Sequence, residues 1–194
     1  HSIHDKTIKY GLSVTGKVKK KEIWENNTPK DGDVILLTKK IGTALVTANY
    51  AQGLVSEDDF ETCVKQMATL NKYARDIFVK YNIHAATDIT GFGLLGHLSE
   101  MAGEDFTIIL ESDKVPVLSP AKKLACEFLY TSGGQNNRNY LEGDIEFMID
   151  DFAMEEVLFD PQTSGGLCLA VSPDEAKKIS CDFKENNLEI YQIG

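Results

Sequence analysis

The sequence predicts an α+β fold, a layered α/β sandwich in which helices cover a sheet, and three observations support this class. Short apolar runs such as Val34–Leu37 and Leu167–Val171 are typical of buried strands. Helical periodicity recurs between such runs, most clearly from Ser56 to Tyr81. The chain has 194 residues and is 42% hydrophobic, so it can bury one sizeable core, or one core with an extension.

The first elements are an extended segment over residues 5–16 and a polar stretch that ends in the turn signal Asp31-Gly32. The run at Val34–Leu37 predicts a buried strand, because it is short, apolar and partly β-branched. Residues 42–52 fit a helix through their apolar positions. These signals place the first strand of the sheet ahead of the first helix.

One long amphipathic helix is predicted from Ser56 to Tyr81, with Asn82 as its stop. Ser56 and Asp59 have the spacing of a capping box, with Asp at its third position. We expect its apolar stripe to pack on the sheet; the alternative is a surface for a partner protein.

The second half alternates between helical and strand-like segments. Helices are predicted over residues 94–101, before Gly103, and over 154–158, with others beginning at Ser119 and Ser172. Strands are predicted over residues 106–110, 145–149, 167–171 and 188–193. Residues 130–139, rich in Gly, Asn and Ser, are predicted to be a loop.

Composition excludes several classes of function. Lys and Arg number 20 against 30 Asp and Glu, so the net charge is −10, which argues against binding to nucleic acid or to anionic membranes. The basic cluster Lys17–Lys21 is short and fits a solvated strand end or turn. No apolar run is long enough to span a membrane, and no signal-peptide pattern occurs. The first residue is His1 rather than Met, so we expect a piece of a longer protein.

The four cysteines, Cys63, Cys126, Cys168 and Cys181, do not form a C-x-x-C pair. This spacing argues against a zinc site. We expect buried or half-buried thiols in a reducing, cytoplasmic compartment.

Asp88 is the first candidate for chemistry, because it stands just before three glycines and an apolar helical run. A carboxylate beside such a turn can hold a hard cation such as Mg²⁺. The glycines allow a ligand to approach the backbone, and the following helix offers free N–H groups to an anion. The alternative is an ordinary turn or capping residue. The pattern suggests metal-assisted handling of phosphate.

A second interpretation of the same stretch is a dinucleotide-binding fingerprint. Gly91, Gly93 and Gly96 have its spacing, and Glu111 follows roughly where the ribose-binding acid would stand. That site needs a buried parallel strand directly before Gly91, and residues 83–90 are polar for that role.

The loop from Asp160 to Gly166 is a further candidate, since its hydroxyl and backbone N–H groups could cradle an anion. The alternative is an elaborate turn whose glycines allow close backbone packing. His97 lies on a helix among apolar residues and is expected to be a core or boundary histidine.

Two long motifs resemble the selenophosphate synthetase (selenide, water dikinase) family: residues 86–97 (ATDITGFGLLGH) and 158–167 (LFDPQTSGGL). Weaker matches follow in the right order, at residues 1–3, 10–16, 31–34 and 138–139. The resemblance covers nearly the whole chain. It implies an enzyme of two α/β-type domains, related to aminoimidazole ribonucleotide synthetase, that acts as a homodimer and makes selenophosphate, AMP and phosphate from selenide, ATP and water.

The resemblance also implies residue roles and domain limits. Residues 1–16 would be the end of the N-terminal ATP-binding domain with a linking strand, and residues 17–194 the C-terminal α+β domain. Asp88 matches a Mg²⁺ ligand, and His1 matches a histidine at the nucleotide site, although the two glycines before that histidine are missing here.

The family's catalytic Cys or selenocysteine, its neighbouring Lys and its other metal-binding aspartates would all precede His1, so no residue of this chain is assigned as the nucleophile. We therefore expect a C-terminal fragment that folds without catalysing. The alternatives are a related synthetase or kinase with the same two-domain plan, such as aminoimidazole ribonucleotide synthetase or thiamine-monophosphate kinase, and a non-catalytic binding or dimerisation module.

Overall fold

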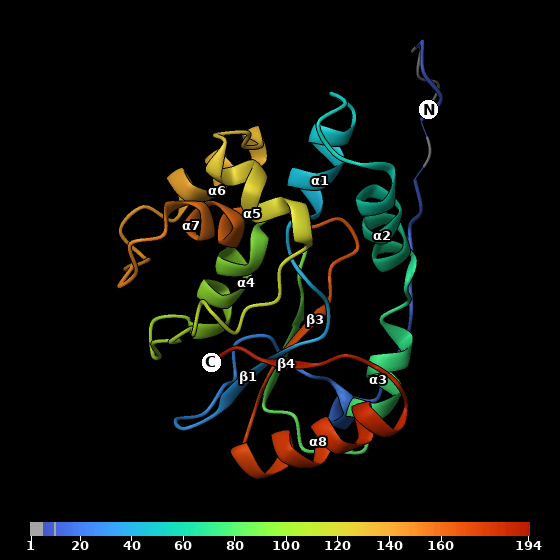
Figure 1. Ribbon diagram of the computed structural model, residues 1–194. Helices are drawn as coiled ribbons and strands as arrows, with labels where there is room; N and C mark the ends of the chain where they lie inside the picture. Colours follow the sequence, from blue (N-terminus) through green and yellow to red (C-terminus); the bar gives the residue numbers. More distant parts are fainter. Residues whose placement is uncertain (1–5, 10) are drawn as a thin grey trace.

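The computed structural model describes residues 6–9 and 11–194, and a four-stranded antiparallel sheet lies at its centre (Figure 1). The strands are β1 (Val34–Leu37), β2 (Ala85–Asp88), β3 (Leu167–Val171) and β4 (Tyr191–Gln192), in the order β2-β3-β1-β4. β3 pairs with both β1 and β2, so that Leu37 lies opposite Cys168 and Asp88 opposite Leu167. The chain therefore has the predicted α+β class.

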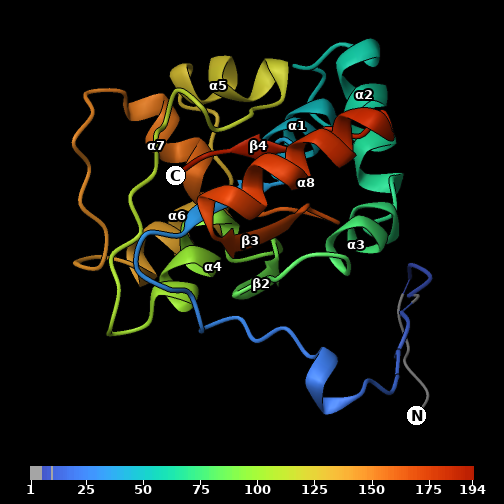
Figure 2. The same ribbon diagram turned by 90° about the horizontal axis from the view of Figure 1, so that it is seen from below.

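Helices cover both faces of this sheet (Figures 1 and 2). They are α1 (Thr43–Tyr50), α2 (Glu57–Ala68), α3 (Lys72–Phe78), α4 (Gly93–Ala102), α5 (Ser119–Cys126), α6 (Ser132–Tyr140), α7 (Phe152–Phe159) and α8 (Pro173–Glu185), with a short 3-10 turn at Lys20–Glu22. In the described part of the chain, none of these helices combines the length and the apolar character needed to cross a membrane.

The core is divided by the sheet, because successive side chains of a strand point to opposite faces. Leu37 and Cys168 belong to a large cluster with residues of α1, α4, α5 and α7. Leu36 and Leu169 belong to a smaller cluster with residues of α3 and α8. Burial on both faces explains why β1 and β3 are continuous apolar runs rather than alternating ones.

The predicted long helix from Ser56 to Tyr81 is wrong, because the chain forms α2 and α3 with a break over residues 69–71. Tertiary hydrogen bonds hold the break: Lys39 Nζ donates to Thr69 O at 2.8 Å, and Asn71 Nδ2 donates to Gly165 O at 2.9 Å. α3 packs on the sheet with α8, and α2 lies against α1. The cap at Ser56 is confirmed, since its Oγ accepts from Asp59 N.

The predicted loop over residues 130–139 is also wrong, since most of it is α6. Thr131 caps this helix by accepting from Gly134 N at 3.1 Å. A Cβ on Gly133 would lie 2.7 Å from Pro161 Cγ, so glycine allows α6 to approach the loop after α7. Close packing therefore explains a glycine that local propensity assigns to a loop.

Residues 106–110 and 145–149 do not form the predicted strands. Ile145, Phe147 and Ile149 pack against the core while Met148 is exposed, so the segment alternates without pairing. The closing strand is shorter than predicted, at two residues, although Ile193 N still donates to Ile35 O. Alternation shows that one side of each segment meets the core, but a strand also needs a neighbouring backbone.

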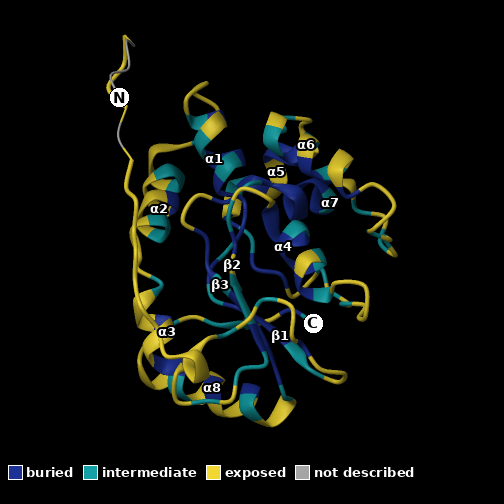
Figure 3. Ribbon diagram, turned by 180° about the vertical axis from the view of Figure 1, so that it is seen from behind, coloured by how far each residue is buried: buried dark blue, intermediate teal, exposed yellow. Residues whose placement is uncertain are grey.

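The described residues of the N-terminal segment, 6–9 and 11–19, form neither helix nor strand and are exposed (Figure 3). Their apolar side chains are exposed too, including Ile8, Leu12 and Val14. The basic cluster ends in the exposed 3-10 turn, in agreement with the predicted solvated turn.

Candidate functional site

Asp88 ends the edge strand β2, and its side chain is exposed. Among the residues that the structure describes, no side chain or N–H group forms a hydrogen bond or ion pair with its carboxylate. An exposed carboxylate without a partner keeps its full capacity as an acceptor or metal ligand. The backbone at the end of β2 therefore fixes where this side chain begins, and no described side chain restrains it further.

The two long motifs meet at this turn. Ile89 N donates to Gly166 O at 2.9 Å, and Gln162 N donates to Thr90 O at 2.9 Å. A Cβ on Gly165 would lie 2.2 Å from Ile89 O, so only glycine allows the two backbones to lie this close. Segments separated by about 70 residues of sequence thus form one structural unit beside Asp88.

The glycines after Asp88 serve packing and turn geometry. Gly93 has a φ of +70°, and a Cβ there would lie 2.7 Å from Phe159 O. A Cβ on Gly96 would lie 2.8 Å from Phe92 Cβ, whereas Gly91 faces open space. β2 is an antiparallel edge strand, and Glu111 is exposed and pairs with Lys114. The dinucleotide interpretation is therefore wrong, because it requires a buried parallel strand before the glycines.

The loop from Asp160 to Gly166 is built around the start of α1. Asp160 Oδ2 accepts from Ala44 N at 3.0 Å, and Gln162 Oε1 accepts from Gly42 N and Thr43 N. Gly42, at the N-cap of α1, has no side chain to accept a hydrogen bond, so these two side chains satisfy the first N–H groups of the helix. The loop therefore agrees with the alternative to an anion-binding loop, an elaborate turn whose glycines allow close backbone packing.

Burial raises the pKa of Asp160 to about 7, although hydrogen bonds from Leu45 N, Ala44 N, Gln162 and Thr131 oppose the rise. Its side chain lies almost entirely out of solvent, at 1% exposure. Desolvation of the charged form outweighs these four donors. Asp160 thus supports the site without facing the solvent around Asp88.

Two further buried side chains bind the turn after Asp88. His97, on α4, accepts at Nε2 from Thr90 N at 3.0 Å, which agrees with a core histidine. Asn137, on α6, donates from Nδ2 to Gly91 O and to Phe159 O, each at 2.9 Å. Sequence reasoning missed Asn137 because its segment was predicted to be a loop. The Thr131 cap signal could have revealed the helix that carries it.

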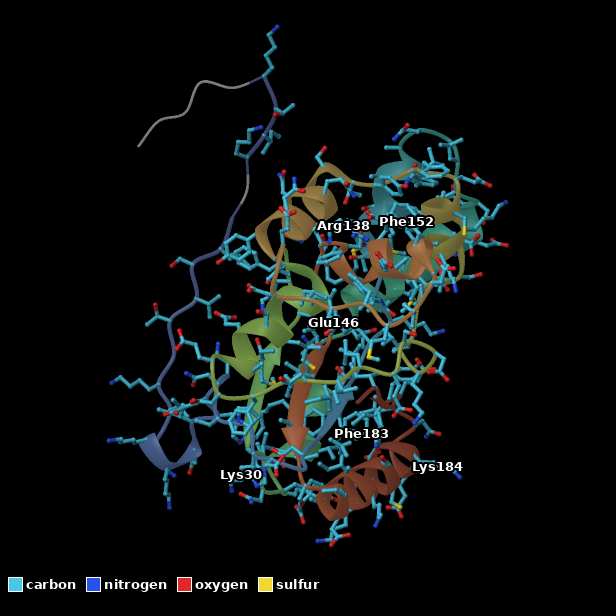
Figure 4. The ribbon with its side chains drawn as sticks, turned by 90° about the vertical axis from the view of Figure 1, so that its left-hand side faces the viewer. Lys30, Arg138, Glu146, Phe152, Phe183 and Lys184 are labelled. Carbon is cyan, nitrogen blue, oxygen red and sulfur yellow. The ribbon has the colours of Figure 1, made fainter. Side chains whose placement is uncertain are left out.

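Arg138, the neighbour of Asn137, has a structural environment. Its guanidinium lies 5.0 Å from the ring centre of Phe159 and pairs with Glu155 at 2.6 Å and with the buried Glu156 at 2.8 Å. Figure 4 shows Arg138 beside Phe152, far from Phe183 on α8. The cation therefore holds α6 to α7 and is already neutralised by two carboxylates.

A hollow of about 250 Å³ lies between α4 and α6, beside Phe92. Of the described residues that line it, the charged ones are Glu100 and Asp144, both acidic. Two carboxylates repel a phosphate, so this hollow is unsuited to bind the phosphates of a nucleotide.

Asp88 fits a shared Mg²⁺ site better than a complete one. No group of three metal-binding side chains occurs among the described residues. Mg²⁺ commonly takes one or two protein carboxylates and fills its other positions with water and substrate phosphates. The donor set here, a single free carboxylate at the surface, fits one ligand of such an ion. His1, the candidate nucleotide-binding residue, lies outside the described residues.

The two buried cysteines, Cys63 and Cys168, are unsuited to act as nucleophiles. Burial raises the pKa of Cys63 to about 11 and that of Cys168 to about 12, which suppresses their thiolates. Cys126 and Cys181 are exposed, contrary to the expected burial, and all four thiols are free.

Comparison with known proteins identifies a family. Residues 30–194 match the family described as "AIR synthase related protein, C-terminal domain". Relatives named selenide, water dikinase are 43% identical over 194 residues in Desulfitobacterium hafniense (strain DSM 10664 / DCB-2) and 45% identical over 195 residues in Agathobacter rectalis. These alignments cover all of this chain but only 57% of each relative, so the chain spans little more than half of their length.

Solved structures share the fold at low sequence identity. Thiamine-monophosphate kinase from Stenotrophomonas maltophilia matches 91% of this chain and 51% of its own, with a TM-score of 0.61 and 14% identity. The hydrogenase maturation protein HypE in complex with ATP matches 88% of this chain and 44% of its own, with a TM-score of 0.54 and 20% identity. These likenesses show that the chain shares the fold of these proteins.

Proposed function

The chain belongs to the AIR synthase related family, as its C-terminal domain, and from this premise we propose that it is the C-terminal part of a selenide, water dikinase. The complete enzyme would form selenophosphate, AMP and phosphate from selenide, ATP and water. The observation that carries this proposal is the junction of the two long motifs at Asp88, in a chain that resembles such enzymes along its full length.

Asp88 is the residue that we propose as a Mg²⁺ ligand. Bound Mg²⁺ would neutralise charge on the phosphates of ATP. The chain's own contribution is to hold the carboxylate at the end of β2, without a competing partner among the described residues, on a turn that Gly166 and Gln162 fix through backbone bonds.

The chain alone should not catalyse. Phosphoryl transfer needs several charged groups around the phosphates, and Asp88 is a single carboxylate in an acidic chain. We propose that the nucleophile, the remaining metal ligands and most of the ATP site lie in a preceding domain. Selenide-dependent ATP consumption by the purified chain would refute this expectation.

We also propose that residues up to 16 belong to that preceding domain. The exposure of Ile8, Leu12 and Val14 supports this, because these side chains have no core to enter here. A homodimer and a cytoplasmic location complete the proposal: the first rests on the family resemblance alone, and the four free thiols support a reducing compartment.

The test is AMP formation from Mg-ATP and selenide by the full-length enzyme, in which this chain follows the N-terminal part found in its relatives. We expect Asp88→Asn to lower turnover by about 100-fold or more, since a metal contributes several kcal/mol to charge stabilisation. Asp105→Asn is the matched control, because Asp105 is also exposed but lies after α4.

Each outcome separates the alternatives. Turnover that survives Asp88→Asn would keep the reaction but remove Asp88 from the site. A folded protein without selenide-dependent AMP formation would favour a related synthetase or kinase. If Asp88→Ala also left the activity of the complete enzyme intact, a binding or dimerisation module would become the better interpretation of this domain.

A further inference from the structure

The backbone after Asp88 is held by two buried polar side chains from two different helices. His97 on α4 is 7% exposed, and Asn137 on α6 is 8% exposed. Burial of a polar side chain has a cost unless its hydrogen bonds are made. The hydrogen bonds that these two residues make therefore indicate what their burial stabilises.

Their bonds go to consecutive residues of the Asp88 turn. His97 Nε2 accepts from Thr90 N at 3.0 Å and lies 2.9 Å from Thr90 Oγ. Asn137 Nδ2 donates to Gly91 O at 2.9 Å, and its second bond reaches Phe159 O at 2.9 Å, at the end of α7. The turn is thus fixed from α4 and α6 as well as by the backbone of the loop after α7.

We propose that His97 and Asn137 are positioning residues that hold Asp88 in the geometry in which it binds a divalent cation. The proposal rests on the proposed metal role of Asp88. Because its carboxylate has no partner among the described residues, the backbone is what places this side chain, through the direction of its Cα–Cβ bond. A loosened turn would spread the carboxylate over many directions and weaken binding through the cost of ordering it again.

The hydrogen bond from Thr90 N requires an acceptor at the Nε2 position of His97. Nε2 must be unprotonated to accept the Thr90 N–H, so in the neutral ring the proton is on Nδ1. Nδ1 is buried and has no hydrogen-bond partner in the part of the chain that the structure describes, and Glu100 Oε2 lies 3.7 Å away. A glutamine can place an acceptor oxygen near the Nε2 position, whereas a leucine of similar size cannot.

The chain offers two matched controls. Asn49 on α1 is buried and donates from Nδ2 to Leu45 O at 2.9 Å and to Leu129 O at 3.1 Å, which repeats the bonding of Asn137 away from the Asp88 turn. His84 is half-buried, pairs with Asp33 at 2.8 Å, and precedes β2, at the other end of that strand from Asp88. Removing either one should lower stability without touching the turn.

The experiment is a Mn²⁺ titration of the full-length enzyme with ATP present, followed by electron paramagnetic resonance, with the thermal midpoint measured for each variant. We expect His97→Leu and Asn137→Leu to raise the Kd for Mn²⁺ by about tenfold, the lower end for residues that orient a metal ligand. His97→Gln should restore most of the affinity. Asn49→Leu and His84→Leu should change it less than about twofold for a comparable loss of thermal midpoint.

Two results would overturn the proposal. One is an unchanged Kd in His97→Leu and Asn137→Leu when Asp88→Asn weakens binding, which would leave the metal role intact. The other is an equal loss in the control variants, which would indicate general destabilisation. If Asp88→Asn itself leaves Mn²⁺ binding unchanged, the proposed metal role of Asp88 fails, and the positioning role fails with it. The Asp88→Asn variant thus distinguishes failure of the metal role from failure of the positioning role alone. If His97→Leu does not fold, His97→Asn, which is too short to reach Thr90, serves the same test.

Discussion

Replacing Asp160 with asparagine should remove a pH dependence from the stability of this domain. Burial raises the pKa of the Asp160 carboxyl to about 7 in the folded chain, from an ordinary value of 3.8. Between these two values the folded state keeps a proton that the unfolded state releases, so rising pH favours unfolding. The stability that protonated Asp160 contributes is therefore complete below pH 3.8 and is lost as the pH rises through 7.

The magnitude follows from the difference between the two pKa values. Each pKa unit corresponds to about 1.4 kcal/mol, so the whole effect is about 4 kcal/mol. About 2 kcal/mol of it should fall between pH 5.5 and pH 8, a range above the pI of about 4.9 where the net charge favours solubility. Asparagine has the same shape and keeps an oxygen that can accept from Ala44 N, but it does not titrate.

The assay is urea unfolding followed by circular dichroism at several pH values across this range. We expect the unchanged chain to lose about 2 kcal/mol more than Asp160→Asn from pH 5.5 to pH 8. Asp105→Asn, at an exposed position, should follow the unchanged chain. If the free energy of unfolding changed with pH in the same way for the unchanged chain and Asp160→Asn, the pKa of Asp160 would be close to its ordinary value of 3.8 in the folded chain. The argument from burial would then fail.

Three other expectations can be checked on the same chain. Gly93→Ala should lower the free energy of unfolding by about 3 kcal/mol, because its φ is +70° and a Cβ would meet Phe159 O, whereas Gly91→Ala should be nearly neutral; urea titration compares them. Arg138→Met should cost about 3 kcal/mol or more in the same assay, because it leaves a buried glutamate without its cation, and a loss below 1 kcal/mol would contradict this. Ellman's reagent should modify two thiols rapidly in the folded chain, Cys126 and Cys181; rapid modification of all four would show that the core opens easily.

The features that were predicted correctly depend on local signals. The runs at Val34–Leu37 and Leu167–Val171 are buried strands, and Ser56 and Ser172 cap helices. The break after α2 was missed because its cause is tertiary: Lys39 binds Thr69 O from 30 residues away. The apolar periodicity of residues 56–81 contains no signal for a hydrogen bond to a residue so far away in the sequence.

The same division applies to the candidate site. The pattern around Asp88 and the loop from Asp160 were both candidate sites in the sequence, and backbone hydrogen bonds join them in the structure. Asn137 was not found, because the carbonyl it binds, Gly91 O, is 46 residues away and its own segment has low helix propensity. His97 stands inside the motif of residues 86–97, whereas the role of Asn137 is recognised only by its contacts.

The exposed N-terminal segment has a consequence for the chain in solution. Ile8, Leu12, Val14 and Val18 are exposed and stand at even-numbered positions, a spacing that would place them on one face if the segment paired as a strand. Each leaves about 1.5 to 3 kcal/mol of burial energy unrealised while it faces water. The segment therefore exposes apolar surface through which the chain on its own should associate. A partner that covers this surface would increase both the solubility and the stability of the chain.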